Sequence, residues 1–376
     1  MLYECWRQIA GEHADELALV EMASVRRWRF RDLFAETERK EVDGMPVVFS
    51  PGVSAQFVLT VLRAWHGGGV VCPLERDQQP PVLSGPLPDG IAHLKTSSAT
   101  TGAPRLIALT AAQMRADAEN IVASMGLRPD WPNVGAISLG HSYGFSNLLL
   151  PLLLHGIPLV LAESALPESV RLAAKSFARV TLAAVPALWQ TWYSADAIPP
   201  NVALAISAGS PLPLTLEKSV FESRGLKIHN FYGSSECGGI AYDASAHPRI
   251  DAACVGAPLR NVTVSVGEDR CLEVRSEAVA MGYWPAPSPA LGNGVFRTSD
   301  LGEITDGLIY LRGRAGDQIN VAGRKVSPEV IEEALVNHPW VRACLAFGVP
   351  GTSEHRGEMV VACVAAEAGV NAEGLK

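Results

Sequence analysis

The chain has 376 residues, of which 48% are hydrophobic and 19% are charged, and its formal net charge is −8 at pH 7. This length exceeds what one hydrophobic core usually supports, so we expect two domains. The acidic balance and the lack of a long basic run argue against nucleic acid as a partner.

Seven cysteines are scattered along the chain without a CxxC pair or a Cys/His cluster. This usage is typical of reduced thiols in a cytoplasmic protein and argues against a structural zinc. The N-terminus carries Glu4 and Arg7 and lacks the apolar centre of a signal peptide. The most apolar stretch, residues 147–162, is short and contains Gly156 and Pro158, so we expect no membrane span.

The first 90 residues alternate between strand and helix patterns. The expected strands cover 17–22, 27–30, 46–50 and 70–73, and the expected helices cover 31–40 and 55–65. The strand-helix-strand order within 46–73 indicates a parallel α/β sheet. Residues 77–90 are rich in proline and predict a loop.

The same alternation continues to residue 231. The expected helices cover 111–125, 146–154, 168–177 and 214–223, and the expected strands cover 134–139, 158–162, 180–185, 203–207 and 227–231. Thr110 is placed to cap the first of these helices. Ligands of parallel α/β sheets bind beyond the carboxyl ends of the strands. Loops of small residues occupy such positions at 97–105, 140–144, 207–210 and 232–239.

After Ala244 the pattern changes to short alternating strands, which indicates a smaller β unit. These strands cover 262–266, 271–274 and 309–312, and a helix over 328–336 and strands over 343–349 and 358–365 follow. The predicted fold class is α/β, with a large N-terminal domain of layered α/β sheets plus a β subdomain. A small α+β C-terminal domain, which we expect to be truncated, completes it. We place the domains at 1–313 and 314–376.

The segment SSATTGAPR at 97–105 gathers hydroxyls, unhindered backbone N–H groups and the cation of Arg105 within nine residues. A polyphosphate needs this combination of donors and positive charge. The segment is not a P-loop, since the chain contains no GxxxxGK[ST]. Taken alone, it could equally be a polar surface loop.

Three further motifs follow in order: FYGSSE at 231–236, FRTSDLG at 296–302 and GRAGDQINVAGRKVSPEVIEEAL at 313–335. Together with SSATTGAPR, they resemble the adenylate-forming superfamily of acyl-CoA synthetases, aryl-acid ligases, peptide-synthetase adenylation domains and luciferases. The resemblance covers nearly the whole chain. It implies that a carboxylic acid attacks the α-phosphate of magnesium-bound ATP, which gives an acyl adenylate and pyrophosphate. The acyl group then passes to a thiol of CoA or of an acyl carrier protein's phosphopantetheine.

The resemblance also assigns residues. It implies a nucleotide site in which Glu236 holds Mg²⁺, Tyr232 stacks on adenine, Asp300 binds the ribose, and Arg314 reaches the ribose or the α-phosphate. The implied catalytic residues are Thr100, Glu236, Arg105 and His141, with Glu236 and Thr100 at the metal. The other implied ATP- or AMP-binding residues are Ser97, Ser98, Thr101, Gly102, Ser207, Gly209, Gly233 and Ser235. Gly323 would approach the thiol in the second step. Singly, each residue also fits a structural role as a turn former, surface charge or core aromatic.

The pocket for the acid is expected to be lined by His141, Ser142, Tyr143, Val185, Gly238 and Gly239. The last two would leave room beside Glu236 for a side group or a chain. Trp189 and Trp192 could close a pocket, but aromatics on a helix more often belong to the core. We expect an aromatic or medium-chain acid.

The chain departs from the family pattern at several positions. Ala99 stands where the family usually has Gly, Arg105 where it has Lys, and Gly316 where the hinge is usually Asp or Lys. The adenylation lysine of the family is assigned to no residue here, so the chain is either truncated or a natural short form. We therefore expect it to bind nucleotide but to form an acyl adenylate slowly or not at all.

A second hypothesis comes from GHSYG at 140–144, which fits the GxSxG elbow of α/β-hydrolases, with HGGG at 66–69 as an oxyanion motif. In an esterase of this kind, Ser142 would be the nucleophile and His338 or His355 the base. The four other motifs would then be unexplained. A third hypothesis is a nucleotide-binding homologue with weak catalysis.

Overall fold

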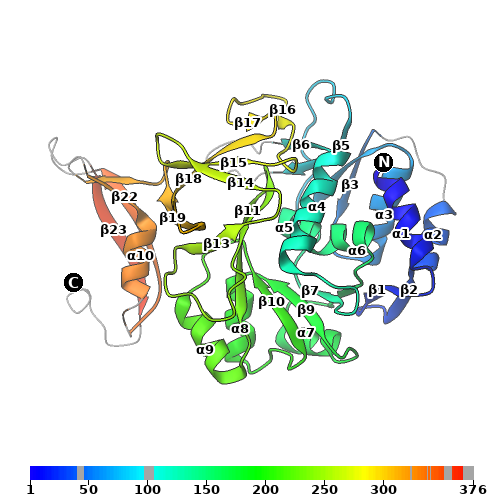
Figure 1. Ribbon diagram of the computed structural model, residues 1–376, viewed down its shortest axis with the longest axis horizontal. Helices are drawn as coiled ribbons and strands as arrows, with labels where there is room; N and C mark the ends of the chain where they lie inside the picture. Colours follow the sequence, from blue (N-terminus) through cyan, green and yellow to red (C-terminus); the bar gives the residue numbers. More distant parts are fainter. Residues whose placement is uncertain are drawn as a thin grey trace. The chain divides into compact units, whose positions relative to one another are not determined.

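The computed structural model describes residues 1–39, 46–96, 106–321, 324–336, 338, 340–350 and 358–366. The chain forms two compact units, of which the first comprises Met1–Val264 and Val274–Phe296 and the second comprises Ser265–Glu273 and Arg297–Lys376. Figure 1 shows the helices and strands of both units. We describe each unit by itself. The predicted domain boundary at Arg314 stays a prediction.

The larger sheet of the first unit has the strand order β13-β12-β11-β10-β9-β7-β8-β1-β2. In that order, the strands are Cys254–Pro258, Gly238–Tyr242, Ile228–Ser234, Val202–Ser207, Val180–Ala184, Asn133–Gly135, Leu159–Leu161, Leu17–Glu21 and Arg26–Arg29. The run from β11 to β1 is parallel, while β12 and β13 continue the sheet antiparallel and β2 closes a hairpin with β1. This parallel run confirms the α/β class that the alternating pattern predicted.

The smaller sheet of the first unit has the order β16-β6-β5-β4-β3. In that order, its strands are Gly282–Trp284, Leu106–Thr110, Ile91–Thr96, Val70–Leu74 and Val47–Pro51. Strands β3, β4 and β5 are parallel, and β6 and β16 are added antiparallel. Thr96 pairs with Leu106, so the predicted phosphate loop at 97–105 joins two adjacent strands. The loop itself lies outside the described residues.

Helices of the first unit alternate with these strands. They are α1 (Leu2–Glu12), α2 (Phe30–Glu38), α3 (Ala55–His66), α4 (Ala111–Met125), α5 (Ser142–Gly144), the π-helix η1 (Phe145–Leu149), α6 (Leu150–His155), α7 (Pro167–Ala174), α8 (Pro186–Ser194) and α9 (Leu214–Arg224). The predicted cap of α4 is confirmed, because Thr110 Oγ1 accepts from Gln113 N at 3.3 Å and Gln113 Oε1 accepts from Thr110 N at 2.8 Å. Gly126 ends that helix in the left-handed region.

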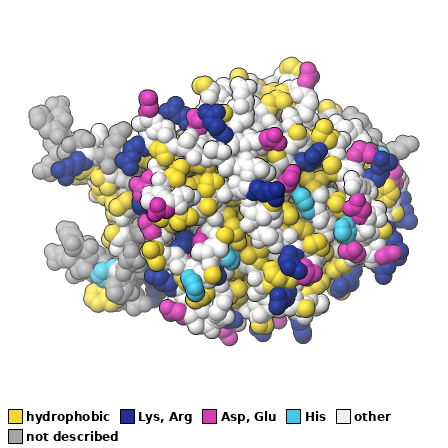
Figure 2. Space-filling model, viewed as in Figure 1, with side chains coloured by type: hydrophobic (Ala, Val, Ile, Leu, Met, Phe, Trp, Pro, Cys, Tyr) yellow, Lys and Arg dark blue, Asp and Glu magenta, His cyan; other side chains and the backbone are white. Residues whose placement is uncertain are grey.

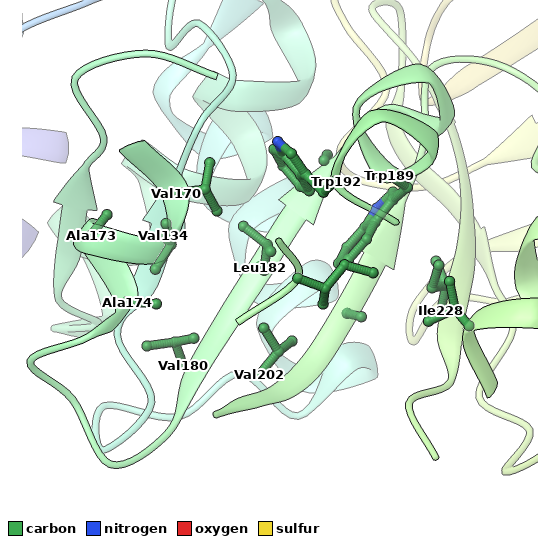
Figure 3. Packing of buried hydrophobic residues seen from close by; sticks show 14 of the residues in the cluster. Val134, Val170, Ala173, Ala174, Val180, Leu182, Trp189, Trp192, Val202 and Ile228 are labelled. Carbon is green, nitrogen blue, oxygen red and sulfur yellow. The ribbon is translucent and has the colours of Figure 1, made fainter. Parts of the chain in front are cut away.

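One hydrophobic core cluster of the first unit lies between the parallel strands and helices α7, α8 and α9. Trp189 and Trp192 are fully buried there, and their rings meet edge to face at 5.4 Å. Figure 3 shows them on α8 above Leu182 and Val202 of the sheet. Each indole N–H is satisfied by a backbone carbonyl, that of Ile206 or Ala165. Both tryptophans therefore belong to the hydrophobic core, which is the second of the two interpretations given for them, and no exposed face of either is left to close a pocket.

The second unit combines strands with one described helix. The strands β14 (Thr263–Val266), β15 (Cys271–Arg275), β18 (Val295–Thr305) and β19 (Leu308–Arg314) are neighbours in that order. The short strand β17 (Leu291–Gly292) belongs to the first unit and pairs with the beginning of β18, Val295 and Phe296, which also belongs to that unit. The hairpins β20 (Ile319–Val321) with β21 (Arg324–Val326) and β22 (Val341–Pro350) with β23 (Glu358–Ala366) flank α10 (Pro328–Val336). The helix at 328–336 and the two long strands match the prediction.

The charged surface and the lengths of the helices both bear on the expectations from composition. Acidic and basic side chains are interspersed on the face shown in Figure 2. Among the described helices, none is both long enough and apolar enough to cross a membrane.

Candidate nucleotide and acid site

Three predicted site segments follow neighbouring parallel strands of the larger sheet. Val185 follows β9, Ser207 ends β10 and continues to Gly209, and Tyr232 lies in β11. Because these strands are parallel and adjacent, their carboxyl ends lie at one edge of the sheet. A Cβ on Gly209 would lie 3.4 Å from Val185 Cγ1, so these two positions are neighbours. The structure thus brings the β9, β10 and β11 segments together.

Glu236 stands in the turn between β11 and β12 and is held on three sides. Its carboxylate Oε1 accepts from the Tyr283 hydroxyl at 2.9 Å, its N–H donates to Ser234 Oγ at 3.2 Å, and its carbonyl accepts from Ala280 N at 2.8 Å. Within the described residues, no hydrogen bond reaches the second carboxylate oxygen. A fixed carboxylate with one oxygen left for a ligand suits a hard cation.

Sequence reasoning missed Tyr283. It lies on β16, opposite Ile107 of β6, and β6 begins directly after the predicted phosphate loop. Strand β16, which pairs with the strand that follows the predicted phosphate loop, therefore fixes the carboxylate proposed for the metal. The pairing joins residues 107 and 283, so no local pattern could have predicted it.

The GHSYG segment begins with a turn at Gly140 and a bend at His141 and continues as the short helix α5, which leads directly into the π-helix η1. A π-helix is often found at functional sites. His141 Nδ1 accepts from Tyr143 N at 3.2 Å, so in the neutral ring Nε2 carries the proton. The Tyr143 hydroxyl donates to the carbonyl of Ile206 at 3.5 Å, and its ring lies 6.0 Å from that of Phe231. Burial raises the Tyr143 pKa, so the hydroxyl stays protonated.

The two glycines of this segment have packing reasons. A Cβ on Gly140 would lie 2.0 Å from Leu74 O, and one on Gly144 would lie 2.0 Å from Ser138 O. The loop is thereby pressed against the end of β4. The upstream HGGG segment ends α3 instead of forming an oxyanion site, because Gly67 N donates to Arg63 O and Gly69 N donates to Ala64 O.

A cavity of about 250 Å³ opens beside this loop within the first unit. Three predicted site residues, His141, Ser142 and Ser235, line it. The other lining residues are Pro73, Glu75, Gln78, His93, Lys95, Thr96, Gly140 and Phe145. The sequence analysis did not single out Glu75, His93 or Lys95. The signal that could have identified His93 and Lys95 was the presence of two basic residues in a strand that also carries Ile91, Ala92 and Leu94.

Gly238 and Gly239 have packing reasons to be small, and the acid pocket predicted beside them stays a prediction. Both glycines are buried in β12, and a Cβ on Gly238 would lie 2.0 Å from the Asp117 carboxylate. A Cβ on Gly239 would meet Leu259 and Phe231. Small residues are needed here because the protein itself occupies the volume.

Asp117 is a second residue that sequence reasoning missed. It is 2% exposed on α4, and it accepts from Gly239 N at 3.0 Å and from Ser146 Oγ at 2.6 Å. It therefore ties α4 to the start of η1 and to the strand after Glu236. A signal was available, since Asp117 lies on the apolar stripe of Met114, Ala118 and Ile121.

In the second unit, Asp300 and Arg314 are paired. They face each other in the register of β18 and β19, and Arg314 Nε lies 3.0 Å from Asp300 Oδ1. The TSD sequence is thus part of a strand and not a turn. Asp300 is itself ordered by Thr298, whose Oγ1 accepts from Asp300 N at 3.0 Å.

Several predicted site residues lie outside the described residues: Ser97, Ser98, Thr100, Thr101, Gly102, Arg105 and Gly323. His355, one candidate base of the hydrolase hypothesis, also lies there. Gly233 is exposed in β11 beside Tyr232, and Ser207 is fully buried with an unpartnered hydroxyl.

Known proteins resemble the chain over most of its length. The chain is 29% identical over 296 residues to a feruloyl-CoA synthase of Amycolatopsis sp, covering 73% of this chain and 59% of the synthase. It is also 29% identical to a probable 2-succinylbenzoate–CoA ligase of Mycobacterium tuberculosis, covering 73% of this chain and 71% of the ligase. The chain thus spans little more than half the length of the first relative.

The fold resembles solved structures closely. ATP-bound MatB from Rhodopseudomonas palustris superimposes with a TM-score of 0.85 over 98% of this chain and 90% of MatB, at 19% sequence identity. At this identity the likeness concerns the fold. The model of the family described as AMP-binding enzyme matches residues 10–284, which is most of the chain. The chain therefore belongs to the AMP-binding enzyme family within the adenylate-forming superfamily.

Proposed function

We propose that the protein is an AMP-forming acid–thiol ligase. It would activate a carboxylic acid with ATP as an acyl adenylate and then transfer the acyl group to CoA or to the phosphopantetheine of a carrier protein. Family membership supports this proposal, as do the two relatives named as CoA synthase and CoA ligase. Their names also support the expected aromatic acid.

The observation that carries the proposal is the fixation of Glu236 by Tyr283. Mg²⁺ in nucleotide sites is usually held by one or two carboxylates together with phosphate oxygens and water. No group of three or more His, Cys, Asp or Glu suited to a metal occurs in the described part of the chain. One ordered carboxylate therefore fits a metal that arrives with the phosphates, and such a metal would offset phosphate charge during the reaction.

The protein's own groups would mainly bind and orient the reactants. The family resemblance assigns Tyr232 of the first unit to adenine, and it assigns Asp300 of the second unit to the ribose, whose hydroxyls can donate to a carboxylate. The His141 ring, with Nε2 protonated, can donate to the acid near the cavity. Because attack of the carboxylate on the α-phosphate, with pyrophosphate as the leaving group, depends on alignment, the fixed loops around β10 and β11 matter more than any single proton transfer.

An acid-dependent exchange of labelled pyrophosphate into ATP tests the proposal, measured with a panel of aryl and acyl acids in the presence of Mg²⁺. Because the adenylation lysine is assigned to no residue, we expect at most slow exchange, greatest with an aromatic acid, and its loss in Glu236→Gln. Binding of MgATP and AMP is measured in parallel by calorimetry. Nucleotide binding without exchange for any acid would favour the third hypothesis, a binding homologue with weak catalysis.

The hydrolase hypothesis receives no support. The glycines of GHSYG are explained by close backbone packing, and HGGG by the end of α3. A fluorophosphonate probe gives a direct check, since stoichiometric labelling of Ser142 would contradict the ligase proposal.

A further inference from the structure

The cavity next to the GHSYG loop contains buried polar groups that lack partners. Among the residues that the structure describes, no hydrogen-bond partner reaches either ring nitrogen of His93 or Glu75 Oε1. All three atoms belong to residues that line the cavity. Because leaving a buried polar group unsatisfied is energetically costly, such a set indicates a site that a polar ligand completes.

His93 presents a neutral ring to this space. Its side chain is fully buried, and its ring lies 4.4 Å from that of Phe145, another lining residue. Burial, with a further contribution from Lys95, lowers the His93 pKa well below its usual value. A neutral imidazole has one N–H donor and one acceptor nitrogen, so it matches a ligand group that both accepts and donates.

Lys95 lies two residues along the same strand and is 6% exposed. It pairs with Ile107, which in turn pairs with Tyr283, so the Lys95 and Tyr283 side chains stand on one face of the smaller sheet. Burial lowers the Lys95 pKa, while Asp117, Cys237 and Glu236 oppose that shift. The basic group is thus surrounded by acidic ones.

The charge around the cavity argues against an anionic substituent. Asp117 and Glu236 act electrostatically on Lys95, and Glu75 adds a third carboxyl group at the cavity wall. Gln78, which also lines the cavity, is already engaged, because it accepts from Glu75 N at 3.1 Å and donates to Thr96 Oγ1 at 3.1 Å. The groups that remain for a ligand are Lys95 and His93 as hydrogen-bond donors and Glu75 Oε1 and His93 as hydrogen-bond acceptors.

We propose that this cavity receives a hydroxyl group of the acid substrate, which accepts from Lys95 or His93 and donates to Glu75 or His93. The inference rests on the proposed function and narrows it to hydroxylated acids. The size permits this, since an engineered cavity of about 150 Å³ is known to hold benzene, whereas this one measures about 250 Å³. Ser235, adjacent to Glu236, lines the same cavity, so its wall reaches the site proposed for the reaction.

Binding of non-hydrolysable acyl-sulfamoyl-adenosines tests the inference without requiring turnover. They are prepared in matched pairs with and without a hydroxyl: benzoyl with each monohydroxybenzoyl, cinnamoyl with each monohydroxycinnamoyl, and hexanoyl with its hydroxylated forms. Dissociation constants come from competition with a fluorescent AMP derivative. We expect one hydroxylated analogue to bind at least about tenfold more tightly than its parent, because the parent leaves the buried groups unpaired.

Variants of His93 and Lys95 test whether the preference for the hydroxylated analogue arises in this cavity. His93→Phe and Lys95→Met should reduce that preference to less than about threefold, and Lys95→Arg should retain part of it. His247→Phe and Lys218→Met, at exposed positions, serve as matched controls and should keep the full preference. Circular dichroism verifies folding, and the wild-type preference stands as a test even if a cavity variant fails to fold.

The outcomes separate the inference from the proposed function. Equal binding within every pair overturns the inference, since water alone would then satisfy the cavity, while the nucleotide site stands. A preference that survives in both His93→Phe and Lys95→Met also overturns it. Failure of every analogue and of AMP to bind overturns the proposed function together with the inference.

Discussion

The Tyr283 hydroxyl donates to Glu236 Oε1 at 2.9 Å and thereby connects the edge strand of the smaller sheet to the turn after β11. Tyr283 also stands in one row with Ile107 and Lys95. A single face of that sheet thus carries a positioning residue for the proposed metal carboxylate and a wall of the cavity. The proposed sites for the nucleotide and for the acid thus share one face of this sheet.

Tyr283→Phe should weaken Mg²⁺-dependent ATP binding about tenfold while leaving the fold intact, because it removes the hydroxyl that orients Glu236 and little volume. Calorimetric titration with MgATP measures the loss, with Tyr193→Phe on α8 as the control. Unchanged affinity in Tyr283→Phe would mean that the hydrogen bond has only a structural role.

Asp117→Ala should destabilise the first unit by about 2 kcal/mol or more, because Gly239 N and Ser146 Oγ would both lose a buried acceptor. Asp117→Asn keeps one carbonyl oxygen and should cost less. Thermal unfolding measures both, with Glu119→Ala on the exposed side of the same helix as the control. A melting temperature in Asp117→Ala equal to that of Glu119→Ala would contradict the role assigned to Asp117.

A buried ionic cluster joins α9 to β11 and the segment after β12. Lys227 donates to Glu217, to Asp243 at 2.6 Å and to Ile228 O at 3.1 Å, and Arg249 Nε donates to Glu217 at 2.9 Å. Lys227→Met should cost about 3–5 kcal/mol, because it leaves buried carboxylates without their shared partner. Thermal unfolding beside Lys218→Met, an exposed change on α9, is the measurement, and similar melting of the two variants would refute the expectation.

The same cluster should make the first unit sensitive to acid. Burial alone would raise the Asp243 pKa, but hydrogen bonds from Lys227 and Ser245 outweigh it and lower the pKa below its ordinary value of 3.8. A lowered pKa means that the carboxylate stabilises the fold above that value and that this contribution is lost as the pH falls through and below it. Melting temperatures between pH 6 and pH 3 should fall less in Asp243→Asn than in the wild type. An identical fall would show that other groups control acid unfolding.

Local features of this fold could be predicted from the sequence, and long-range ones could not. The cap of α4 was predictable because Thr110 and Gln113 are three residues apart and bond to each other. The parallel sheet was predictable from the alternation of apolar strands with amphipathic helices. Asp300 was harder, since TSD is typical of a turn, whereas the pairing of β18 with β19 makes it part of a strand.

The site was predictable only where motifs identify residues. Glu236, Tyr232 and His141 follow from motifs, but Tyr283, His93 and Lys95 enter through the order of strands in the smaller sheet. Gly238 and Gly239 were expected to leave an opening because glycine has no side chain. In the structure a Cβ on Gly238 would meet Asp117, a residue 121 positions earlier in the sequence, so local reasoning could not predict that contact.

The central claim, that the protein binds a magnesium-bound adenosine nucleotide through Glu236, is tested most directly by calorimetric titration with ATP. The titrations compare wild type and Glu236→Gln, each with Mg²⁺ and with EDTA. We predict that wild-type affinity falls at least about tenfold in EDTA and that Glu236→Gln binds equally weakly in both conditions. Wild-type affinity that does not depend on Mg²⁺, or a Glu236→Gln variant that keeps the full Mg²⁺ dependence, would contradict the claim.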